Sequence, residues 1–590
     1  MSKTSSFIEW RKRVAGPAII LLAAGIAVAP LLKRGPSCGS DLFFHLASWL
    51  QAQNSMLLGI PYPHWAPGSN FGAGEPRFVF YPPLTWMTGA ALGLVLPWGL
   101  VGSVFGFLLL AATGFANRAL AREVLEDGPA TLAGCASIFF GYVLLTFYVR
   151  SDFAELAGGF WIPLMILFLL RDRNPSGGFW RRTLDGSTVP LAITVAGVWL
   201  SNGPAGLMAS YLLAALAISA AALGKTWAPL VRAAVGCTLG LGLAGDFLVP
   251  AAWEGRWANL HSAIAIHHYQ VEYSWLFSHH ADPGLRLHEH DEHLLMASWV
   301  GISMIAVTLL GILVAWRRGV LPGPRRWWIP LALVPFTVLF FLLPVSLPIW
   351  NLLPLLRYLQ FPWRWLLVLE APMAIFFASA IWLVPLRKRI PALGACCIVF
   401  LALSALAGKY LFTDCGAYQE VVVQAEEIGM GVYGRPEYGP AGAEFGDVRY
   451  DQPGACLVPQ MTTLSGQLGA PLNPPPKARR GGCAAGFTAV LYQPEHKRIT
   501  GIANYPGYLI LKLRSYPAWR VKVNGRPVSP VVERSYGVMA VPVPQGPVEV
   551  IVDWSTTPDV IAGRWISGAS VLLLTGLWLL ERRLRKARLS

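Results

Sequence analysis

The sequence predicts a polytopic α-helical membrane protein that carries a β-rich domain outside the membrane. The chain has 590 residues, of which 54% are hydrophobic and only 13% are charged, and its mean hydropathy is +0.49. Soluble domains carry about 25% charged residues, so half that share cannot cover a surface that faces water. The composition therefore argues against a soluble enzyme, a disordered chain and a nucleic-acid-binding protein, and it makes the lipid bilayer the first expected partner.

About twelve segments are apolar and long enough to cross a membrane, since a hydrocarbon core roughly 30 Å thick takes about 20 mostly apolar residues in a helix. The stretch 83–97 is apolar but shorter, and we expect it to form a helix that lies in the membrane interface. The predicted spans are residues 14–32, 99–120, 130–149, 156–171, 188–201, 203–223, 229–250, 295–316, 327–343, 364–385, 391–411 and 561–580.

Membrane topology explains the net charge of +15. Clusters of Lys and Arg flank the predicted spans, and alternating crossings place all of these clusters on one side of the membrane. Because basic residues accumulate on the cytoplasmic side, we expect this side to be the cytoplasm, with both termini inside. The clusters are Arg11–Arg13, Arg118 with Arg122, Arg171–Arg182, Lys225 with Arg232, Arg317–Arg326, Arg387–Arg389 and Arg582–Arg588.

This topology divides the chain into a transmembrane core and an extracytoplasmic domain. The core, residues 1–411, carries two outer loops, 33–98 and 251–294. Residues 412–558 change composition sharply and form the predicted β-rich domain. Residues 559–590 form the last transmembrane helix and a basic cytoplasmic tail.

Alternating apolar and polar residues predict the strands of the β-rich domain. Residues 509–513, 520–523 and 548–552 alternate in this way and are expected to be strands. Asn524-Gly525 lies between two such runs, and this dipeptide is a strong signal for a two-residue hairpin turn.

Cysteines in the extracytoplasmic domain are candidates for a disulfide. Cys415, Cys456 and Cys483 fall within this domain, in a compartment that is expected to be oxidising. The simplest pairing is Cys456–Cys483, and free or buried thiols are the alternative.

Ionisable side chains gather near the outer ends of the predicted spans. Each costs roughly 2.5–3.5 kcal/mol within the apolar core, so their positions are informative. Asp41 and His45 open the first outer loop, and a spacing of four residues places them on one face of a helix. Two further groups follow the third span and enter the tenth: Arg150, Asp152 and Glu155, then Arg357, Gln360, Arg364 and Glu370.

Each group also has a purely structural explanation, which the sequence leaves open. Asp41 is well placed to N-cap the helix that follows it. Arg150 can extend its charged end to the membrane interface and form a salt bridge with Glu155. Arg357 and Arg364 can act as anchors for lipid headgroups. Glu370 and Asp246 suit a buried structural pair.

The second outer loop holds eight of the 11 histidines of the chain. His288, His290 and His293 have spacings found among metal ligands, which makes a divalent metal ion the one candidate cofactor. These residues match no fixed metal motif, and an acidic, His-rich loop that is simply solvated is the alternative.

Motifs from nearly the whole chain match a known group of proteins. The most specific motif is Gln360-Phe361-Pro362-Trp363-Arg364. The others are the Asp41–His45 start, Gly59–Trp65, Phe80–Leu84, Arg150–Glu155, Leu353–Tyr358 and Ser515–Gly525. With these motifs the chain resembles the bacterial YfhO-like membrane proteins, a group often labelled 6-pyruvoyl-tetrahydropterin synthase-related membrane proteins.

The resemblance implies a place in the GT-C glycosyltransferase superfamily. It implies a multi-span, GT-C-like core in the bacterial inner membrane and a polyprenyl-phosphate sugar donor. In such enzymes an acidic residue early in the first outer loop is the usual catalytic base, and Asp41 is the residue that matches this position. The sequence holds no motif of a soluble pterin synthase.

We therefore expect a membrane glycosyltransferase that moves a sugar from a polyprenyl-phosphate donor to a glycan, lipid or protein acceptor at the extracytoplasmic face. Asp41 is the expected catalytic base, oriented by His45. Arginines suit the charge on the leaving phosphate, and Asp152 or Glu155 is expected to orient the acceptor or to hold a divalent metal ion. The expected phosphate ligands are Arg357, Arg364 and Arg150, with Gln360, Glu370 and Tyr81 in support and aromatic residues such as Trp65 and Trp363 beside the sugar.

Two other functions stay open on the sequence alone. The first is a non-catalytic membrane scaffold whose β domain binds glycan or protein, and it predicts that Asp41 and Arg357 tolerate substitution. The second is a transporter or flippase for a lipid-linked sugar. Transporters of this kind predict charges along a midplane path and inverted repeats, whereas the sequence shows few mid-span charges and no internal repeat.

Overall fold

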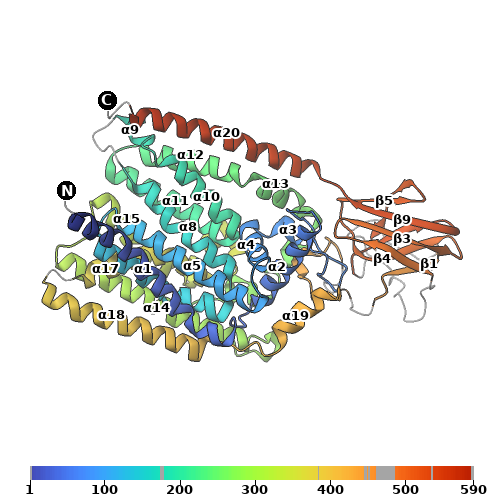
Figure 1. Ribbon diagram of the computed structural model, residues 1–590, viewed down its shortest axis with the longest axis horizontal. Helices are drawn as coiled ribbons and strands as arrows, with labels where there is room; N and C mark the ends of the chain where they lie inside the picture. Colours follow the sequence, from blue (N-terminus) through green and yellow to red (C-terminus); the bar gives the residue numbers. More distant parts are fainter. Residues whose placement is uncertain are drawn as a thin grey trace.

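A helical bundle with a β domain attached at one end makes up the molecule (Figure 1). Both chain termini lie at the end of the bundle that is farthest from the β domain. The computed structural model describes residues 3–172, 178–382, 385–443, 448, 452–459, 486–532 and 536–586.

Nine helices of the described residues are long and apolar enough to cross a membrane, and two bent helix pairs raise this number to eleven. The prediction of a polytopic α-helical membrane protein is thereby confirmed. The nine are α1 (Lys3–Arg34), α5 (Trp98–Ala121), α6 (Asp127–Ile138) continued by α7 (Gly141–Leu144) and the π-helix η1 (Leu145–Arg150), α8 (Phe153–Leu170), α11 (Gly203–Gly224), α14 (His288–Arg317), α17 (Leu366–Ile381), α18 (Leu386–Leu406) and α20 (Pro558–Lys586). The bent pairs join α12 (Ala228–Leu243) to α13 (Gly245–Glu254) and α15 (Arg325–Phe341) to α16 (Leu347–Leu352).

One predicted span is a short helix. Residues 188–201 form α10 (Thr188–Ser201), which has 14 residues and is therefore about 21 Å long. The helix ends because the backbone of Asn202 is extended, with φ −155° and ψ 123°. The Asn202 side chain then caps α11 by accepting a hydrogen bond from the Ala205 amide at 2.8 Å.

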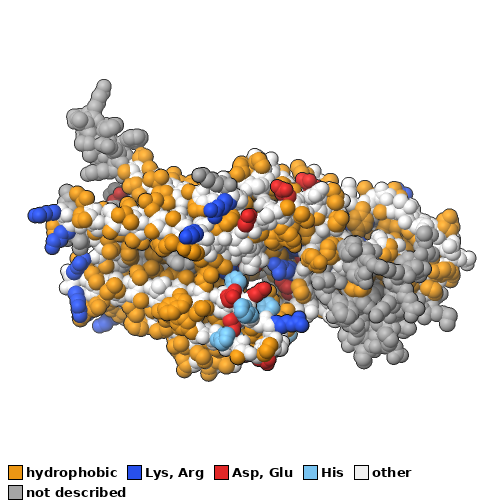
Figure 2. All heavy atoms as spheres, turned by 90° about the horizontal axis from the view of Figure 1, so that it is seen from below, with side chains coloured by type: hydrophobic (Ala, Val, Ile, Leu, Met, Phe, Trp, Pro, Cys, Tyr) orange, Lys and Arg blue, Asp and Glu red, His pale blue; other side chains and the backbone are white. Residues whose placement is uncertain are grey.

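Basic residues from different helices meet at the end of the bundle that holds both termini, where Figure 2 shows Lys and Arg side chains along the edge. Arg182, in α9 (Phe179–Thr183), and Arg326 both pair with Asp172, at 2.8 and 2.9 Å. Arg118 pairs with Asp127 at 2.6 Å. We call this the basic end. Its assignment to the cytoplasm stays a prediction.

The first outer loop builds the opposite end of the bundle, which we call the β-domain end. The loop folds into α2 (Leu42–Leu57), α3 (Arg77–Phe80) and α4 (Pro83–Gly93). Helix α4 covers most of the segment predicted to lie in the interface. With 11 residues it is about 16 Å long, which is too short to cross a membrane.

Two antiparallel sheets form the β domain, in the strand orders β1-β4-β8-β7 and β2-β3-β9-β5-β6. The three strands predicted from alternation correspond to β4, β5 and β9. The hairpin is also confirmed, because Val523 pairs with Arg526 around Asn524 and Gly525, whose φ angles are 49° and 80°. The strands are β1 (Ala455–Pro459), β2 (Phe487–Tyr492), β3 (His496–Ala503), β4 (Gly507–Arg514), β5 (Trp519–Val523), β6 (Arg526–Val528), β7 (Val531–Val532), β8 (Val538–Val543) and β9 (Gly546–Trp554).

Two tryptophans from loops of the membrane core attach the β domain to the bundle. Trp65 is 1% exposed and packs against Trp519, Tyr516 and Trp554 at ring-centroid distances of 5.2, 6.0 and 5.6 Å. Trp257 meets Tyr516 at 5.6 Å. The prediction that Trp65 lies beside a sugar is wrong, because its ring fills the core of the β domain.

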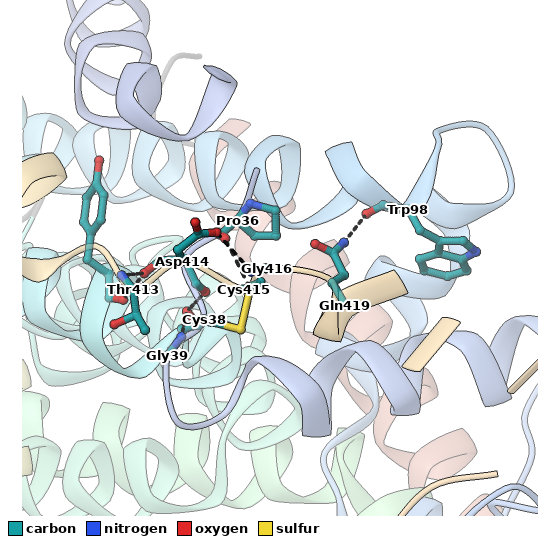
Figure 3. The surroundings of a disulfide bond; sticks show 12 residues. Pro36, Cys38, Gly39, Trp98, Thr413, Asp414, Cys415, Gly416 and Gln419 are labelled. Carbon is teal, nitrogen blue, oxygen red and sulfur yellow. Dashed lines mark hydrogen bonds between the residues drawn. A yellow bond between two sulfur atoms is a disulfide. The ribbon is translucent and has the colours of Figure 1, made fainter. Parts of the chain in front are cut away.

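A disulfide joins the first outer loop to the segment that follows α18 (Figure 3). Cys38 is bonded to Cys415, 377 residues later in the chain. The Cys38 amide also donates a hydrogen bond to the Thr413 carbonyl at 2.8 Å. The sequence did not reveal this pairing. In the predicted Cys456–Cys483 pair, Cys483 lies outside the described residues.

Helix α19 (Tyr418–Glu427) packs along α2 and extends this connection. The ring of Tyr418 meets that of Phe43 at 4.4 Å, and the Gln51 amide donates a hydrogen bond to the buried carboxylate of Glu426 at 2.7 Å. Burial raises the pKa of Glu426 to about 7, although Gln51 and Arg77 act in the opposite direction. The first outer loop is therefore held both by a covalent bond and by a second helix.

Removal of the disulfide is expected to destabilise the protein. A disulfide that closes a long loop contributes about 2–4 kcal/mol to the free energy of unfolding, so the double substitution Cys38→Ser with Cys415→Ser should lower the thermal unfolding midpoint. Tryptophan fluorescence of the purified full-length protein measures this midpoint. Cys397→Ser removes an exposed free thiol and serves as the control. An unchanged midpoint in the double variant contradicts the stabilising role.

Glu426 is expected to make stability depend on pH. Its pKa is about 7 in the folded protein against an ordinary value of 4.5, so the folded state holds the proton more tightly than the unfolded chain. The resulting stabilisation is full below pH 4.5 and is lost as the pH rises through 7. Because Glu426→Gln cannot ionise, it should raise the unfolding midpoint at pH 8 by a few degrees, and this gain should shrink towards pH 5. The exposed neighbour Glu427 supplies the control, Glu427→Gln, and a gain that does not change with pH contradicts the assignment.

Candidate active site at the β-domain end

Backbone hydrogen bonds place Asp41 beside the turn after the third span. The Asp41 amide donates to the Arg150 carbonyl at 2.8 Å, and the Ser40 amide donates to the Val149 carbonyl at 3.3 Å. Gly39 lies against the backbone of this turn so closely that a Cβ atom there would overlap Arg150. Asp41 is thus fixed by main-chain contacts that do not depend on its own side chain.

The turn itself has an unusual backbone. The third span ends in the π-helix η1, and Ser151 follows in the left-handed region with φ 53°. Asp152 then caps α8, accepting a hydrogen bond from the Glu155 amide at 2.9 Å. Single π-helical turns are frequent at functional sites. Here the turn brings Arg150, Asp152 and Glu155 together over six residues of chain.

The Arg150 guanidinium bridges three carboxylates. It donates to Glu155 Oε2 through Nη1 and to Asp152 Oδ2 through Nη2, both at 2.7 Å, and Nη2 lies 3.7 Å from Asp41 Oδ2. Arg150, Asp152 and Glu155 are buried, whereas the side chain of Asp41 is 32% exposed. The guanidinium also lies over the ring of Trp363, 5.0 Å from its centroid. We call this group the Arg150 cluster.

Asp41 is the exposed member of the Arg150 cluster. It occupies the N-cap position of α2, yet its side chain makes no capping hydrogen bond. N-capping as its sole role is therefore wrong. The carboxylate is left with Arg150 on one side and with an exposed face on the other.

His45 connects the cluster to Tyr81. The ring is 1% exposed, with Nε2 3.6 Å from Asp152 Oδ1 and Nδ1 3.3 Å from the Tyr81 hydroxyl. Burial and the charge of Asp152 raise the pKa of Tyr81. Burial alone would raise the pKa of Asp152, but Arg150 and His45 hold it below its ordinary value. Asp152 therefore stays ionised. The His45 ring contacts Asp152 and Tyr81 and makes no hydrogen bond to the Asp41 carboxylate in the described chain, so the structure does not support the expectation that His45 orients Asp41.

A second arginine reaches the cluster from the 3₁₀ turn η9 (Pro362–Trp365), which directly precedes α17. Arg364 Nε lies 3.4 Å from Glu155 Oε2, and Nη1 donates to Gln360 Oε1 at 3.2 Å. Gln360 in turn donates to the Ala263 carbonyl at 2.7 Å, which ties the second outer loop to the site. The Tyr142 hydroxyl donates to the other oxygen of Glu155. The groups Asp41–His45 and Arg150–Glu155 thus meet completely. The group that enters the tenth predicted span contributes Arg364, Gln360 and Trp363.

Arg357 and Glu370 lie apart from these contacts. Arg357 pairs with Glu272 at 2.6 Å and donates to Asn351 at 2.8 Å, and its side chain is 41% exposed. Glu370 is buried within α17, and its Oε1 has no hydrogen-bond partner among the described residues. The suggested Glu370–Asp246 pair is wrong, because Asp246 lies 3.4 Å from Arg564 of α20.

Arg435 is a candidate that the sequence did not suggest. Its guanidinium lies over the ring of Phe44 at 5.0 Å, and its amide donates to Glu75 Oε2 at 3.0 Å. Burial lowers the pKa of Arg435, but Glu437 and Asp41 together raise it above its ordinary value. Arg435, from the segment after α19, therefore stays charged and lies within electrostatic range of Asp41. No sequence signal marks it, because the two residues lie far apart in the chain.

The three histidines proposed as metal ligands do not converge. His288 is exposed beside Glu292, His290 bonds to the Tyr273 carbonyl at 2.9 Å and His293 to the Glu289 carbonyl of its own helix at 2.7 Å. Figure 2 shows a surface patch of His and acidic side chains in this region. Within the described ranges, no three His, Cys, Asp or Glu residues are arranged to hold a metal ion.

Comparisons with known proteins give distant likenesses to membrane glycosyltransferases. No protein-family model and no curated protein matches the chain. Among solved structures, the chain is similar to arabinofuranosyltransferase AftD from Mycobacteria, with 17% identity, a TM-score of 0.43 and coverage of 71% of this chain and 29% of AftD. It is similar to the Archaeoglobus fulgidus oligosaccharyltransferase in its apo form, with 14% identity, a TM-score of 0.44 and coverage of 74% and 62%.

A third similar structure is ArnT from Cupriavidus metallidurans bound to undecaprenyl phosphate, with 14% identity, a TM-score of 0.30 and coverage of 74% of this chain and 84% of ArnT. The chain spans less than a third of AftD and less than two thirds of the oligosaccharyltransferase. Likenesses at this level assign neither a reaction nor a substrate to this chain.

The Arg150 cluster is expected to be far more sensitive to substitution than the Arg357 pair. Arg150→Lys cannot bridge three carboxylates, and breaking a buried ion pair costs about 3–5 kcal/mol. Arg357→Lys alters a pair that is partly exposed on both sides, where the median cost is about 0–1 kcal/mol. The measurement is the thermal unfolding midpoint of each purified variant. Equal midpoints for the two variants contradict the proposed importance of the cluster.

Proposed function

We propose that the protein is a glycosyltransferase that transfers a sugar from a polyprenyl-phosphate donor to a hydroxyl-bearing acceptor at the β-domain end. The observation that carries this proposal is the carboxylate of Asp41. It is held beside a buried arginine, lacks a capping hydrogen bond and is 32% exposed. A carboxylate in this setting is positioned to accept a proton from an incoming group.

The proposed reaction is a single displacement. Asp41 takes the proton from the acceptor hydroxyl, and the oxygen attacks the anomeric carbon of the donor. The bond between that carbon and the phosphate oxygen breaks, and the polyprenyl phosphate leaves with the electron pair. One displacement inverts the configuration at the anomeric carbon.

The leaving phosphate is negatively charged and needs a positively charged side chain whose nitrogens are not all bonded to protein groups. Arg150 is committed to carboxylates on both of its terminal nitrogens, so we assign it the positioning of Asp41. Arg435 carries its charge within electrostatic range of Asp41. Arg364 pairs with Glu155 through Nε and donates through Nη1 to Gln360 and the Leu359 carbonyl, so its Nη2 is the nitrogen left without a hydrogen bond or ion pair among the described residues. These two arginines are the proposed ligands of the phosphate, because charge-assisted hydrogen bonds to phosphate are strong and directional.

The lipid donor is supported by the fold and by the sequence resemblance. A helical bundle with apolar outer surface allows a carrier with a hydrocarbon tail to reach the site from the bilayer. The motifs shared with the YfhO-like proteins, and through them the GT-C superfamily, supply the expectation of a polyprenyl-phosphate sugar. We propose that the β-domain end faces the outside of a bacterial inner membrane, so that the acceptor is an envelope glycan, lipid or protein.

Loss of the Asp41 carboxylate is expected to abolish the transfer. The test is mass spectrometry of envelope glycans and lipid-linked sugars in a strain that lacks the gene, complemented with the wild type, Asp41→Asn or Asp282→Asn. Asp282 is an exposed carboxylate of the second outer loop and provides the matched control. Wild type and Asp282→Asn should restore the missing decoration, whereas Asp41→Asn at equal membrane abundance should not.

The location of the unused donor separates the transferase from the two alternatives. A transferase defect leaves the lipid-linked sugar on the outer surface, where periodate added to spheroplasts can oxidise it. A flippase defect leaves it protected inside. Full restoration by Asp41→Asn removes Asp41 from the mechanism and favours the scaffold.

A further inference from the structure

An apolar groove runs between α1, α6 and α18 at the basic end. Its volume is about 890 Å³, near the upper limit of the about 300–1,000 Å³ found for small-molecule sites. Most of its lining is hydrophobic, and it includes Ile26, Phe139 and Phe400 at the deep end. The proposed glycosyl transfer takes place at the other end of the bundle and makes no use of this groove.

The groove exists because α18 packs loosely on the bundle. The apolar stretch of α18 is only 17% buried within the protein, the lowest share among the nine candidate spans of the described chain. The contacts that α18 does make lie partly at its far end, where Ser404 donates to the Ile26 carbonyl at 2.7 Å. One turn below that contact, the ring of Phe400 stacks on that of Phe139 at the end of α6, with 4.9 Å between the centroids, and the groove opens from there towards the basic end.

The groove is about as deep as one leaflet of a bilayer. Its lining on α6 runs from Asp127 to Phe139, which is about 18 Å of helix. Half of a hydrocarbon core roughly 30 Å thick is about 15 Å. This depth suits acyl chains that end at the bilayer midplane.

The mouth of the groove carries more positive than negative charge. Arg118, Arg122 and Asp127 line it, and Arg389 lies over the ring of Trp382, another lining residue, at 4.6 Å. Asp127 accepts from Arg118 at 2.6 Å, while Arg122 lies 3.4 Å from the same carboxylate and is 55% exposed. Asp127 therefore faces two guanidinium groups of the lining, which leaves an excess of one positive charge among these three residues.

We propose that this groove binds an anionic glycerophospholipid, with its acyl chains between α1, α6 and α18 and its phosphate at Arg122. The apolar lining and the leaflet depth select the chains, and the excess positive charge at the mouth selects an anionic headgroup. The site is independent of the proposed glycosyl transfer, since it lies at the opposite end of the molecule. The bound lipid fills the space that separates α18 from the bundle.

Native mass spectrometry of the purified full-length protein tests this proposal. The probes are dioleoyl phosphatidylglycerol, dioleoyl phosphatidylcholine and undecaprenyl phosphate. Arg122→Gln removes the more exposed of the two positive charges at the mouth, and Arg317→Gln, which changes an exposed arginine at the end of α14, is its control. Cys397→Trp fills the groove from an exposed lining position. Its control is Ile398→Trp, which changes the next residue of α18, 69% exposed and not part of the lining.

We expect one retained phosphatidylglycerol and a clear preference for it over phosphatidylcholine. Arg122→Gln should lower this preference about fivefold, the factor expected for one basic residue beside an anionic lipid surface, and Arg317→Gln should leave it unchanged. Cys397→Trp should lose the retained lipid while Ile398→Trp keeps it, with unfolding midpoints showing that all variants are folded. Equal retention of the two phospholipids, retention of undecaprenyl phosphate alone, or equal retention by the two tryptophan variants overturns the proposal.

Discussion

The guanidinium of Arg150 lies at the centre of the β-domain end, within 2.7 Å of Asp152 and Glu155 and 3.7 Å from Asp41. Charges buried in a low-dielectric interior are costly unless they are paired and hydrogen-bonded. This requirement ties together the start of the first outer loop, the end of the third span and the start of α8. Arg364 adds the entry to α17 to the same set. The π-helical turn, the left-handed Ser151 and the close approach of Gly39 all serve to bring these charges into contact.

A second constraint holds the outer loop in the position that the cluster requires. The Cys38–Cys415 disulfide and α19 fasten the loop from one side, and Trp65 fastens it to the β domain from the other. The segment after α19 also carries Arg435, whose guanidinium lies over Phe44 and within electrostatic range of Asp41. The β domain therefore contacts the bundle through the first outer loop, and Trp519 and Trp554 pack against Trp65 in its core. The apolar groove lies at the basic end, the opposite end of the bundle from the Arg150 cluster.

Much of the site could be predicted from the sequence because charged residues are rare in apolar segments and stand out. The pair Asp41 and His45, the turn from Arg150 to Glu155, and Arg364 were all recognised in this way, and the structure brings them together. Arg357 carried the same signal but pairs with Glu272 at the edge of the second outer loop. The sequence could not distinguish these two arginines, because both lie in the same motif next to aromatic residues. The histidines of that loop had metal-like spacing, yet local backbone and carboxylate partners take up their nitrogens.

The sequence by itself determined the membrane-spanning architecture, the side of the bundle on which the basic clusters meet, and the Asn524-Gly525 hairpin. These features depend on local composition and short-range periodicity, which every segment carries independently of the rest of the chain. Only the tertiary structure decided that Cys38 meets Cys415, that Arg435 lies over Phe44 and within electrostatic range of Asp41, and that α18 borders an apolar groove. Those features depend on contacts between segments up to hundreds of residues apart, and on how well helices of similar hydropathy pack. Hydropathy alone shows that a helix lies in the membrane, but not which neighbours it will touch.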